Sequence, residues 1–218
     1  MAIMQPYFLP YAGYFRLISG SDTFVIYDCV QFPRRGWVHR NKLRDRNGVE
    51  QWLTLPLTPA PRGVRLDELV FPHDAAAELE RRLSPFGLQD AAGAAAVLLA
   101  ELGKVEGRPV DYIARLLETA CGLLEVHWNV MRSSSLQVPD SFRGQDRILE
   151  ICRRVGATRY INAPGGRELY DPATFAKAGV DLQFLPPFKG ATGSILQRLV
   201  DDPPERVRTE LYDWLPED

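Results

Sequence analysis

Short apolar runs and helix-like periodicities alternate along the chain. The run Ala2-Ile3-Met4 predicts a buried strand within residues 1–6, and β-branched and aromatic residues predict another at 23–27. The same kind of pattern predicts strands at 51–57, 126–131, 159–162 and 180–185. Apolar residues at helical spacing predict helices at 11–20, 74–83, 91–102, 110–124, 140–155 and 172–178.

Strands that alternate with helices predict an α/β fold, a Rossmann-like parallel sheet with an inserted helical subdomain. We expect one domain with a core at 1–73 and 126–190, a helical insertion at 74–125 and a C-terminal tail at 191–218. The tail is charged and interrupted by proline from Asp201, so a peripheral position is expected. Residues 29–48 form a long polar segment that ends in Asn47-Gly48, a hairpin-type turn.

The turn after the first predicted strand is the first candidate site. Pro6 and Pro10 withhold two backbone N–H donors, so the strand cannot continue through them. Gly13 allows another group to approach the backbone closely. In an open parallel sheet, ligands bind at such turns. The polar candidates here are Gln5, Tyr7, Tyr11 and Tyr14. The three phenols either face the ligand or are core aromatics with satisfied hydroxyls.

A basic stretch inside the polar segment is the second candidate. It contains Arg34, Arg35, His39, Arg40, Lys42, Arg44 and Arg46. Only Asp45 opposes these residues, and Trp37 lies among them. Guanidinium groups bind phosphate in a bidentate manner, and an aromatic ring beside arginines suits a base or a sugar. The alternative is a charged loop that is merely solvated.

The third candidate is the turn that follows the strand at 159–162. Gly165 and Gly166 could expose backbone N–H groups to an anion, and Arg167 could add charge. A plain turn is the alternative. We expect this turn and the turn of residues 5–14 to face the same cleft, with Asp28 at its edge.

Four further side chains could carry chemistry by residue type. Asp28 follows the strand at 23–27 and could act as a base, hold a substrate amine or serve as a structural cap. Cys29 has no evident base beside it in sequence, so we expect no thiol catalysis. His73 and His127 are expected to be structural, whereas His39 has arginine neighbours and the better claim to function.

Composition narrows the class of protein. The 218 residues are 45% hydrophobic and 25% charged, as in an ordinary soluble globular domain. A net charge of −2 argues against a general nucleic-acid binder. Three widely separated cysteines predict reduced thiols and no metal site, which is typical of a cytoplasmic protein. We expect neither a membrane span nor a signal peptide.

Several stretches resemble the WbqC-like family. They are Met4 to Tyr14, Ser21 to Asp28, Arg35-Gly36-Trp37, Arg40-Asn41, Ser133-Ser134, Asp146 to Leu149 and Tyr160 to Asp171. The resemblance implies a role in bacterial O-antigen or polysaccharide biosynthesis and a glycine-transferase activity, with Asn41 among the binding residues. That family usually has an acid where Cys29 stands here.

A more distant likeness links Pro10 to Tyr14 with nucleotidyltransferases of the HIGH type. Those enzymes carry His-x-Gly-His there, and both histidine positions are tyrosine in this chain, Tyr11 and Tyr14. These tyrosines either replace the histidines or only pack. The acidic residue and apolar strand that follow are similar to pantothenate synthetase, which forms an amide through an acyl adenylate.

Together these observations favour an aminoacyl transferase of glycyl type, or another amide-forming enzyme, acting on an amine of a sugar or related metabolite. The predicted catalytic residues are Tyr11, Tyr14, Asp28 and His39. The predicted binding residues are Gln5, Tyr7, Arg34, Arg35, Trp37, Arg40, Asn41, Gly165, Gly166 and Arg167. ATP or an aminoacyl-tRNA acceptor end could supply the donor, and the acceptor could be a nucleotide-linked sugar. The alternative is a non-catalytic nucleotide or nucleotide-sugar binding protein.

Overall fold

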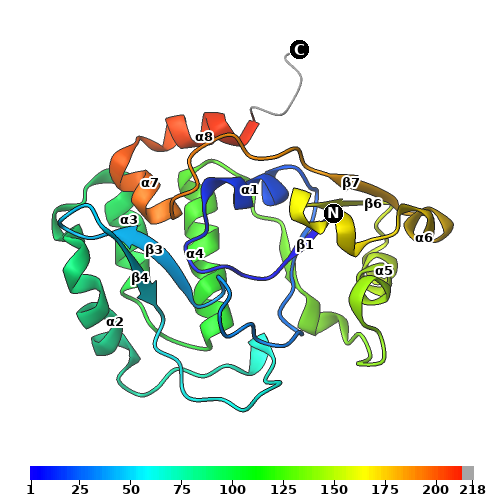
Figure 1. The fold of residues 1–218 in the computed structure, drawn as a ribbon, viewed down its shortest axis with the longest axis horizontal. Helices are drawn as coiled ribbons and strands as arrows, with labels where there is room; N and C mark the ends of the chain where they lie inside the picture. Colours follow the sequence, from blue (N-terminus) through cyan, green and yellow to red (C-terminus); the bar gives the residue numbers. More distant parts are fainter. Residues whose placement is uncertain (213–218) are drawn as a thin grey trace.

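A five-stranded parallel sheet forms the centre of the molecule (Figure 1). The computed structural model describes residues 1–212. The strands of the sheet are β1 (Ala2–Met4), β2 (Phe24–Ile26), β5 (Val130–Arg132), β6 (Arg159–Asn162) and β7 (Asp181–Phe184). They lie in the order β5-β2-β1-β6-β7, and every neighbouring pair is parallel. This sheet and its flanking helices confirm the predicted α/β, Rossmann-like fold.

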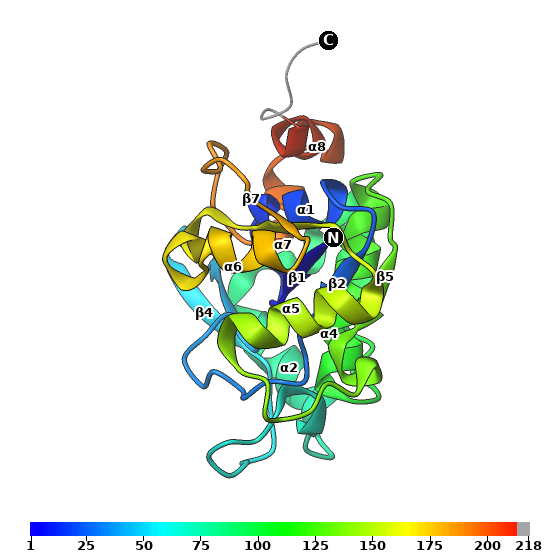
Figure 2. The same ribbon diagram turned by 90° about the vertical axis from the view of Figure 1, so that its right-hand side faces the viewer.

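Helices cover both faces of the sheet. They are α1 (Ala12–Ser19), α2 (Ala75–Leu83), α3 (Gly93–Leu102), α4 (Pro109–Leu123), α5 (Gly144–Val155), α6 (Pro172–Lys177), α7 (Ile195–Asp201) and α8 (Pro204–Tyr212). Successive strand residues point to opposite faces and enter two separate hydrophobic clusters. Ile3 and Val25 join the cluster of α5 and α6, which lie toward the viewer in Figure 2. Ala2 and Phe24 join the cluster of α1 and α4.

The order of the strands fixes where a ligand can be expected. From β1 the chain moves outward to β2 and β5, and then returns across β1 to β6 and β7. The direction therefore reverses between β1 and β6. In open parallel sheets the crevice beyond the carboxyl ends of the strands at such a point is the usual ligand site.

The polar segment contains a strand that the sequence did not predict. Residues Arg40–Arg44 form β3, which pairs antiparallel with β4 (Glu50–Thr54) across the Asn47-Gly48 turn. Of the side chains of β3, only Leu43 is apolar, so the period-two pattern was too weak to recognise. The hairpin packs against α2 and α7 at the left of Figure 1.

The C-terminal region is less peripheral than the sequence suggested. Helix α8 lies along α1, and Val207 and Leu211 are fully buried. Ile195 and Leu196 of α7 are buried as well. The sequence did not predict these two helices. Each is short, Pro203 separates them and many of their residues are charged, so their apolar positions form no clear helical pattern. The part of the predicted tail at 213–218 lies outside the described residues. Within residues 1–212, no helix is long and apolar enough to cross a membrane.

Candidate functional site

A cavity of about 300 Å³ lies beside the turn that follows β1. Its lining residues are Tyr7, Pro10, Tyr11, Trp37, Asn41 and Thr192. Its volume is at the lower end of the range for small-molecule sites, which suits one compact chemical group. Tyr7, Tyr11, Trp37 and Asn41 are predicted site residues that the structure brings together here.

The turn is held by hydrogen bonds from two distant segments. Asn41 Nδ2 donates to the carbonyls of Phe8 and Leu9 at 3.1 and 2.6 Å. Ser194 Oγ also donates to the Leu9 carbonyl, at 2.9 Å. Leu9 adopts a left-handed φ of 47°, which is unfavourable for a leucine and persists where neighbours fix the backbone. Pro6 and Pro10 contribute no backbone N–H donor to this turn, and Ile195 N donates to the Pro10 carbonyl at 2.8 Å.

The three predicted tyrosines have different environments. Tyr14 is buried in the core, and its hydroxyl donates to the Gln5 carbonyl at 2.9 Å. Burial raises the pKa of Tyr14 well above its ordinary value, and burial also raises the pKa of Tyr7 and Tyr11. Tyr7 and Tyr11 line the cavity, so they present protonated phenols there at neutral pH. Gln5 does not line the cavity.

The ring of Tyr11 lies so close to Gly13 that the position has no room for a side chain. A Cβ atom at this position would lie 2.3 Å from Tyr11 Cε2 and 2.8 Å from Phe188 Cγ. The two rings meet edge to face, with centroids 5.6 Å apart. The close approach that the sequence indicated at this glycine is therefore made by a side chain that lines the cavity.

The basic segment places one aromatic ring in the cavity and an arginine near it. Trp37 lines the cavity and lies 5.4 Å from Trp52 of β4, measured between ring centroids. The guanidinium of Arg40 covers the Trp52 ring at 4.2 Å and donates to the Arg35 carbonyl at 2.8 Å. Arg34 instead donates to the Ala60 carbonyl, on the neighbouring loop.

His39 packs its ring against Phe32, with centroids 4.9 Å apart. Burial, helped by the charge of Arg40, lowers the pKa of His39 to about 4. The imidazole is therefore neutral at pH 7, and its Nδ1 is buried with no hydrogen-bond partner among the described residues 1–212. A neutral ring of such low basicity is a weak general base.

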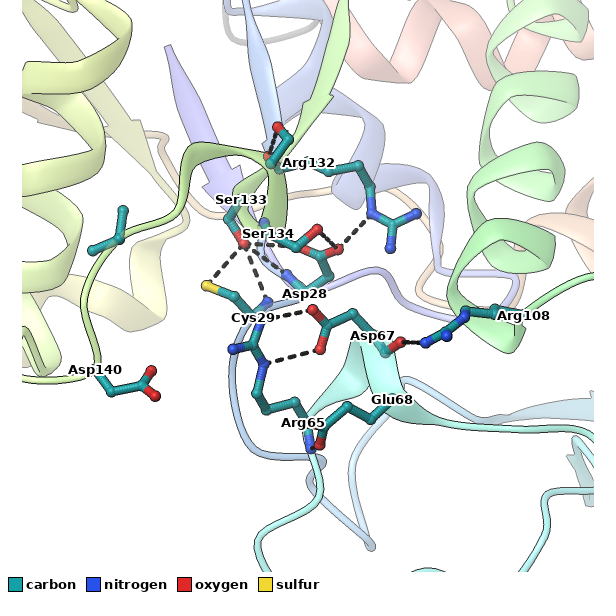
Figure 3. A network of polar contacts seen from close by, with 12 residues as sticks. Asp28, Cys29, Arg65, Asp67, Glu68, Arg108, Arg132, Ser133, Ser134 and Asp140 are labelled. Carbon is teal, nitrogen blue, oxygen red and sulfur yellow. Dashed lines mark hydrogen bonds and ion pairs between the residues drawn. The ribbon is translucent and has the colours of Figure 1, made fainter.

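Asp28 lies at the centre of a buried polar network at the carboxyl ends of β2 and β5 (Figure 3). Its Oδ1 accepts from Ser133 Oγ and Ser134 N, both at 2.8 Å. Its Oδ2 accepts from Ser134 Oγ at 2.7 Å and from Arg132 Nε. Burial alone would raise the pKa of Asp28, but these hydrogen bonds outweigh it and the pKa is lowered. Arg132 also pairs with Asp111 in the first turn of α4.

A second arginine–carboxylate pair supports the same network. Arg65 holds Asp67 through two hydrogen bonds of 3.0 and 2.6 Å. Asp67 N donates to the Asp28 carbonyl at 3.1 Å, and Arg108 donates to the Asp67 carbonyl at 2.6 Å. Figure 3 shows Arg65 and Asp67 below Asp28, and Arg108 to the right of Asp67. They tie the loop before α2 and the start of α4 to the edge of the sheet.

The glycine turn after β6 does not line the cavity. Residues Pro164–Leu169 form a 3-10 helix, and a Cβ atom on Gly166 would lie 2.2 Å from Asn162 Nδ2. Gly165 is exposed, and Arg167 places its guanidinium 4.9 Å from the centre of the Phe184 ring. The turn shares the carboxyl edge of the sheet with the first turn, because β1 and β6 are parallel neighbours.

The sequence did not indicate every residue of this region. Thr192 reaches the cavity from the long loop after β7, and Trp52, from the strand predicted at 51–57, packs beside Trp37. Arg132 and Asp111 come from β5 and α4. No local motif marks any of the four. Within residues 1–212, no three His, Cys, Asp or Glu side chains gather in a way that could hold a metal ion.

One protein family matches this chain over most of its length. The model of the WbqC-like protein family matches residues 5–190. The uncharacterized protein Rv1507c from Mycobacterium tuberculosis is 28% identical over 185 residues, which cover 83% of this chain and 79% of that protein. No solved structure matches this chain. Because the family model matches most of the chain, the chain belongs to the WbqC-like protein family.

Proposed function

We propose that the protein is an aminoacyl transferase of glycyl type, or another amide-forming enzyme, that acts on an amine of a sugar or related small metabolite. The observation that carries the proposal is the cavity, where two protonated phenols, Tyr7 and Tyr11, lie beside the amide of Asn41. Attack of an amine on an acyl carbon forms a tetrahedral oxyanion. Hydrogen-bond donors fixed in a largely apolar cavity stabilise such an oxyanion more than water does.

The bond changes assign roles to these groups. The N–C bond forms, the bond from the acyl carbon to the leaving oxygen breaks, and the amine loses a proton to the leaving group or to solvent. Tyr7 and Tyr11 would donate hydrogen bonds to the acyl oxygen. Tyr14, Asp28 and His39 would act as positioning residues, because the first is buried, the second is saturated with hydrogen bonds and the third is weakly basic.

The direct test is formation of an amide. The protein is incubated with either glycyl-tRNA or glycine and ATP, together with nucleotide-linked amino sugars, and products are analysed by mass spectrometry. We expect an acceptor that has gained one glycyl residue, and a rate reduced by roughly a hundredfold in Tyr11→Phe. If neither donor yields an amide with any amino-sugar acceptor, the proposal is wrong for this class of acceptor.

A second candidate function is binding without turnover of a nucleotide or nucleotide-sugar. One observation favours it: none of the six residues lining the cavity is an acid or base that titrates near neutral pH. In the same incubation, saturable binding of a nucleotide-sugar without product would identify this function.

Arg35 and Arg40 are expected to bind the phosphate of the donor or of a nucleotide. Each charge-assisted contact contributes about 1.5–3 kcal/mol, so Arg35→Ala or Arg40→Ala should weaken binding by roughly ten- to a hundredfold. Arg40→Lys should restore affinity only in part, because an ammonium cannot reproduce the planar fork. Affinity should also fall as salt rises. Calorimetric titration with ATP and a nucleotide-sugar at low and high salt measures both effects.

Arg143→Ala is the matched control, because Arg143 is an exposed arginine that precedes α5 on the other side of the molecule. Equal affinities of all these variants and the parent would mean that Arg35 and Arg40 only solvate the loop.

Cys29→Ser is expected to retain most of the activity. The thiol is buried, and the hydroxyl that contacts it, Ser133 Oγ at 3.2 Å, is not a base. Thiol catalysis needs an activating base or a similar device. Initial rates of parent and variant should therefore agree within severalfold. A hundredfold loss, about 2.7 kcal/mol, would assign a catalytic role to Cys29.

A further inference from the structure

The outward face of the β3–β4 hairpin carries an unusual set of side chains. The register pairs Lys42 with Trp52 and Arg40 with Thr54, so these four residues share one face of the hairpin. Leu43 and Leu53 lie on the opposite face and are buried. The outward face is therefore aromatic and cationic, whereas the inward face belongs to the core.

Two tryptophans are exposed on this face. Trp37 and Trp52 have 45% and 43% of their surface accessible, although each could bury a large apolar area. Their rings are tilted by 42° rather than stacked flat. Each ring therefore keeps accessible surface, and the Trp37 ring also lines the cavity. An exposed apolar surface of this kind is typical of a binding site.

The ion pairing of the two arginines of this segment differs from that of Lys42. Among residues 1–212, no carboxylate pairs with Arg35 or Arg40, whereas Lys42 pairs with Glu50 at 3.1 Å. Arg40 contacts Trp52 and the Arg35 carbonyl, and its Nε is buried with no hydrogen-bond acceptor in the part of the chain that the structure describes. An anion placed here would satisfy charges that the protein leaves uncompensated.

We propose that Trp37, Trp52, Arg35 and Arg40 form a nucleotide subsite, in which the base stacks on the tryptophans and a phosphate binds the arginines. The inference deepens the proposed function, on which it rests: a nucleotide held here would extend the group that it carries into the cavity through the shared residue Trp37. A neutral sugar would use the rings but leave the arginines without an anion. Aromatic platforms beside cations are how single-stranded nucleic acids and nucleotides are commonly held.

Three sources could supply the same chemistry of base and phosphate. They are ATP or its acyl adenylate, a nucleotide-sugar, and the single-stranded 3′ end of an RNA. The experiment therefore titrates the protein with ATP, with UDP-N-acetylglucosamine and with a short single-stranded RNA ending in CCA. Inorganic pyrophosphate is the ligand without a base. Binding is followed by tryptophan fluorescence, which stacking should quench, and by calorimetry.

Trp52→Ala tests base stacking without changing a residue that lines the cavity. We expect it to weaken binding of at least one base-containing ligand by roughly ten- to a hundredfold and to leave pyrophosphate affinity unchanged. Trp52→Phe should retain most of the affinity. Arg40→Ala should weaken every ligand, including pyrophosphate. Val70→Ala, which removes another exposed apolar side chain, should change nothing. The ligand whose affinity depends most on Trp52 identifies the source.

Two results would overturn the subsite. One is pyrophosphate binding as tightly as each base-containing ligand, and the other is an unchanged affinity of Trp52→Ala for all three. Amide formation decides the proposed function separately. If Trp52→Ala still forms amide at the parent's rate, with the parent's KM for both donor and acceptor, the subsite is wrong and the proposed transferase activity is retained. If nucleotide affinity depends on Trp52 but the parent forms no amide, the nucleotide subsite is supported and the proposed transferase activity is wrong.

Discussion

Replacing Asp28 by asparagine should lower the free energy of unfolding by about 3–5 kcal/mol. The carboxylate is completely buried and accepts four hydrogen bonds, two on each oxygen. The asparagine amide would place N–H donors against groups that are themselves donors. It would also remove one of the two carboxylates that compensate Arg132, which is half-buried and would keep only Asp111 as an ion-pair partner. Urea unfolding, followed by circular dichroism, measures the loss.

The same carboxylate predicts how stability depends on pH. The pKa of Asp28 is lowered in the folded protein, so folding favours the ionised form. Its contribution is present above the pKa of an unfolded aspartate, about 3.9, and is lost as the pH falls through the folded pKa. As the pH falls below about 4, the stability of the parent should therefore decrease more steeply than that of Asp28→Asn.

Asp90→Asn is the control, because Asp90 is exposed. It should change stability by no more than about 0.5 kcal/mol. An Asp28→Asn protein as stable as this control would mean that the network of Figure 3 contributes little to folding.

Gly13→Ala should impair both ligand binding and stability, although alanine is the better helix former. The added methyl would lie 2.3 Å from the Tyr11 ring and 2.8 Å from Phe188, so at least one ring must move. Such overpacking costs typically 1–3 kcal/mol, which exceeds the helix-propensity gain of about 1 kcal/mol. Displacement of Tyr11 would remove one wall of the cavity, so we expect binding in the cavity to weaken by at least tenfold.

Gly122→Ala is a matched control within α4. A Cβ atom there would meet no other atom within 4 Å, and the position is exposed. This variant should therefore be stabilised by about 0.5–1 kcal/mol, with unchanged binding. Thermal unfolding and ligand titration of both variants measure the contrast. If Gly13→Ala were also stabilised and bound ligand normally, Tyr11 would not be held in the position that forms the cavity.

The chain's local patterns determined most of the regular elements and the class of fold. Apolar runs and helical spacing are short-range properties, so β1, β2, β6 and β7 and the helices α1 to α6 could be predicted close to their observed bounds. The alternation of strands and helices then implied a parallel sheet. Pro6, Pro10 and Gly13 marked the turn that borders the cavity, because each restricts or frees the backbone locally.

Only the tertiary structure decided which distant residues meet. Asp28 and Arg132 are 104 positions apart and are joined because β2 and β5 are neighbours in the sheet. Thr192 and Tyr7 share the cavity because the loop after β7 returns to the first turn. Trp52 faces Trp37 because β3 and β4 pair in one register, and a shift by one residue would turn Trp52 to the other face. Such contacts depend on strand order and register, which no local pattern of residues specifies.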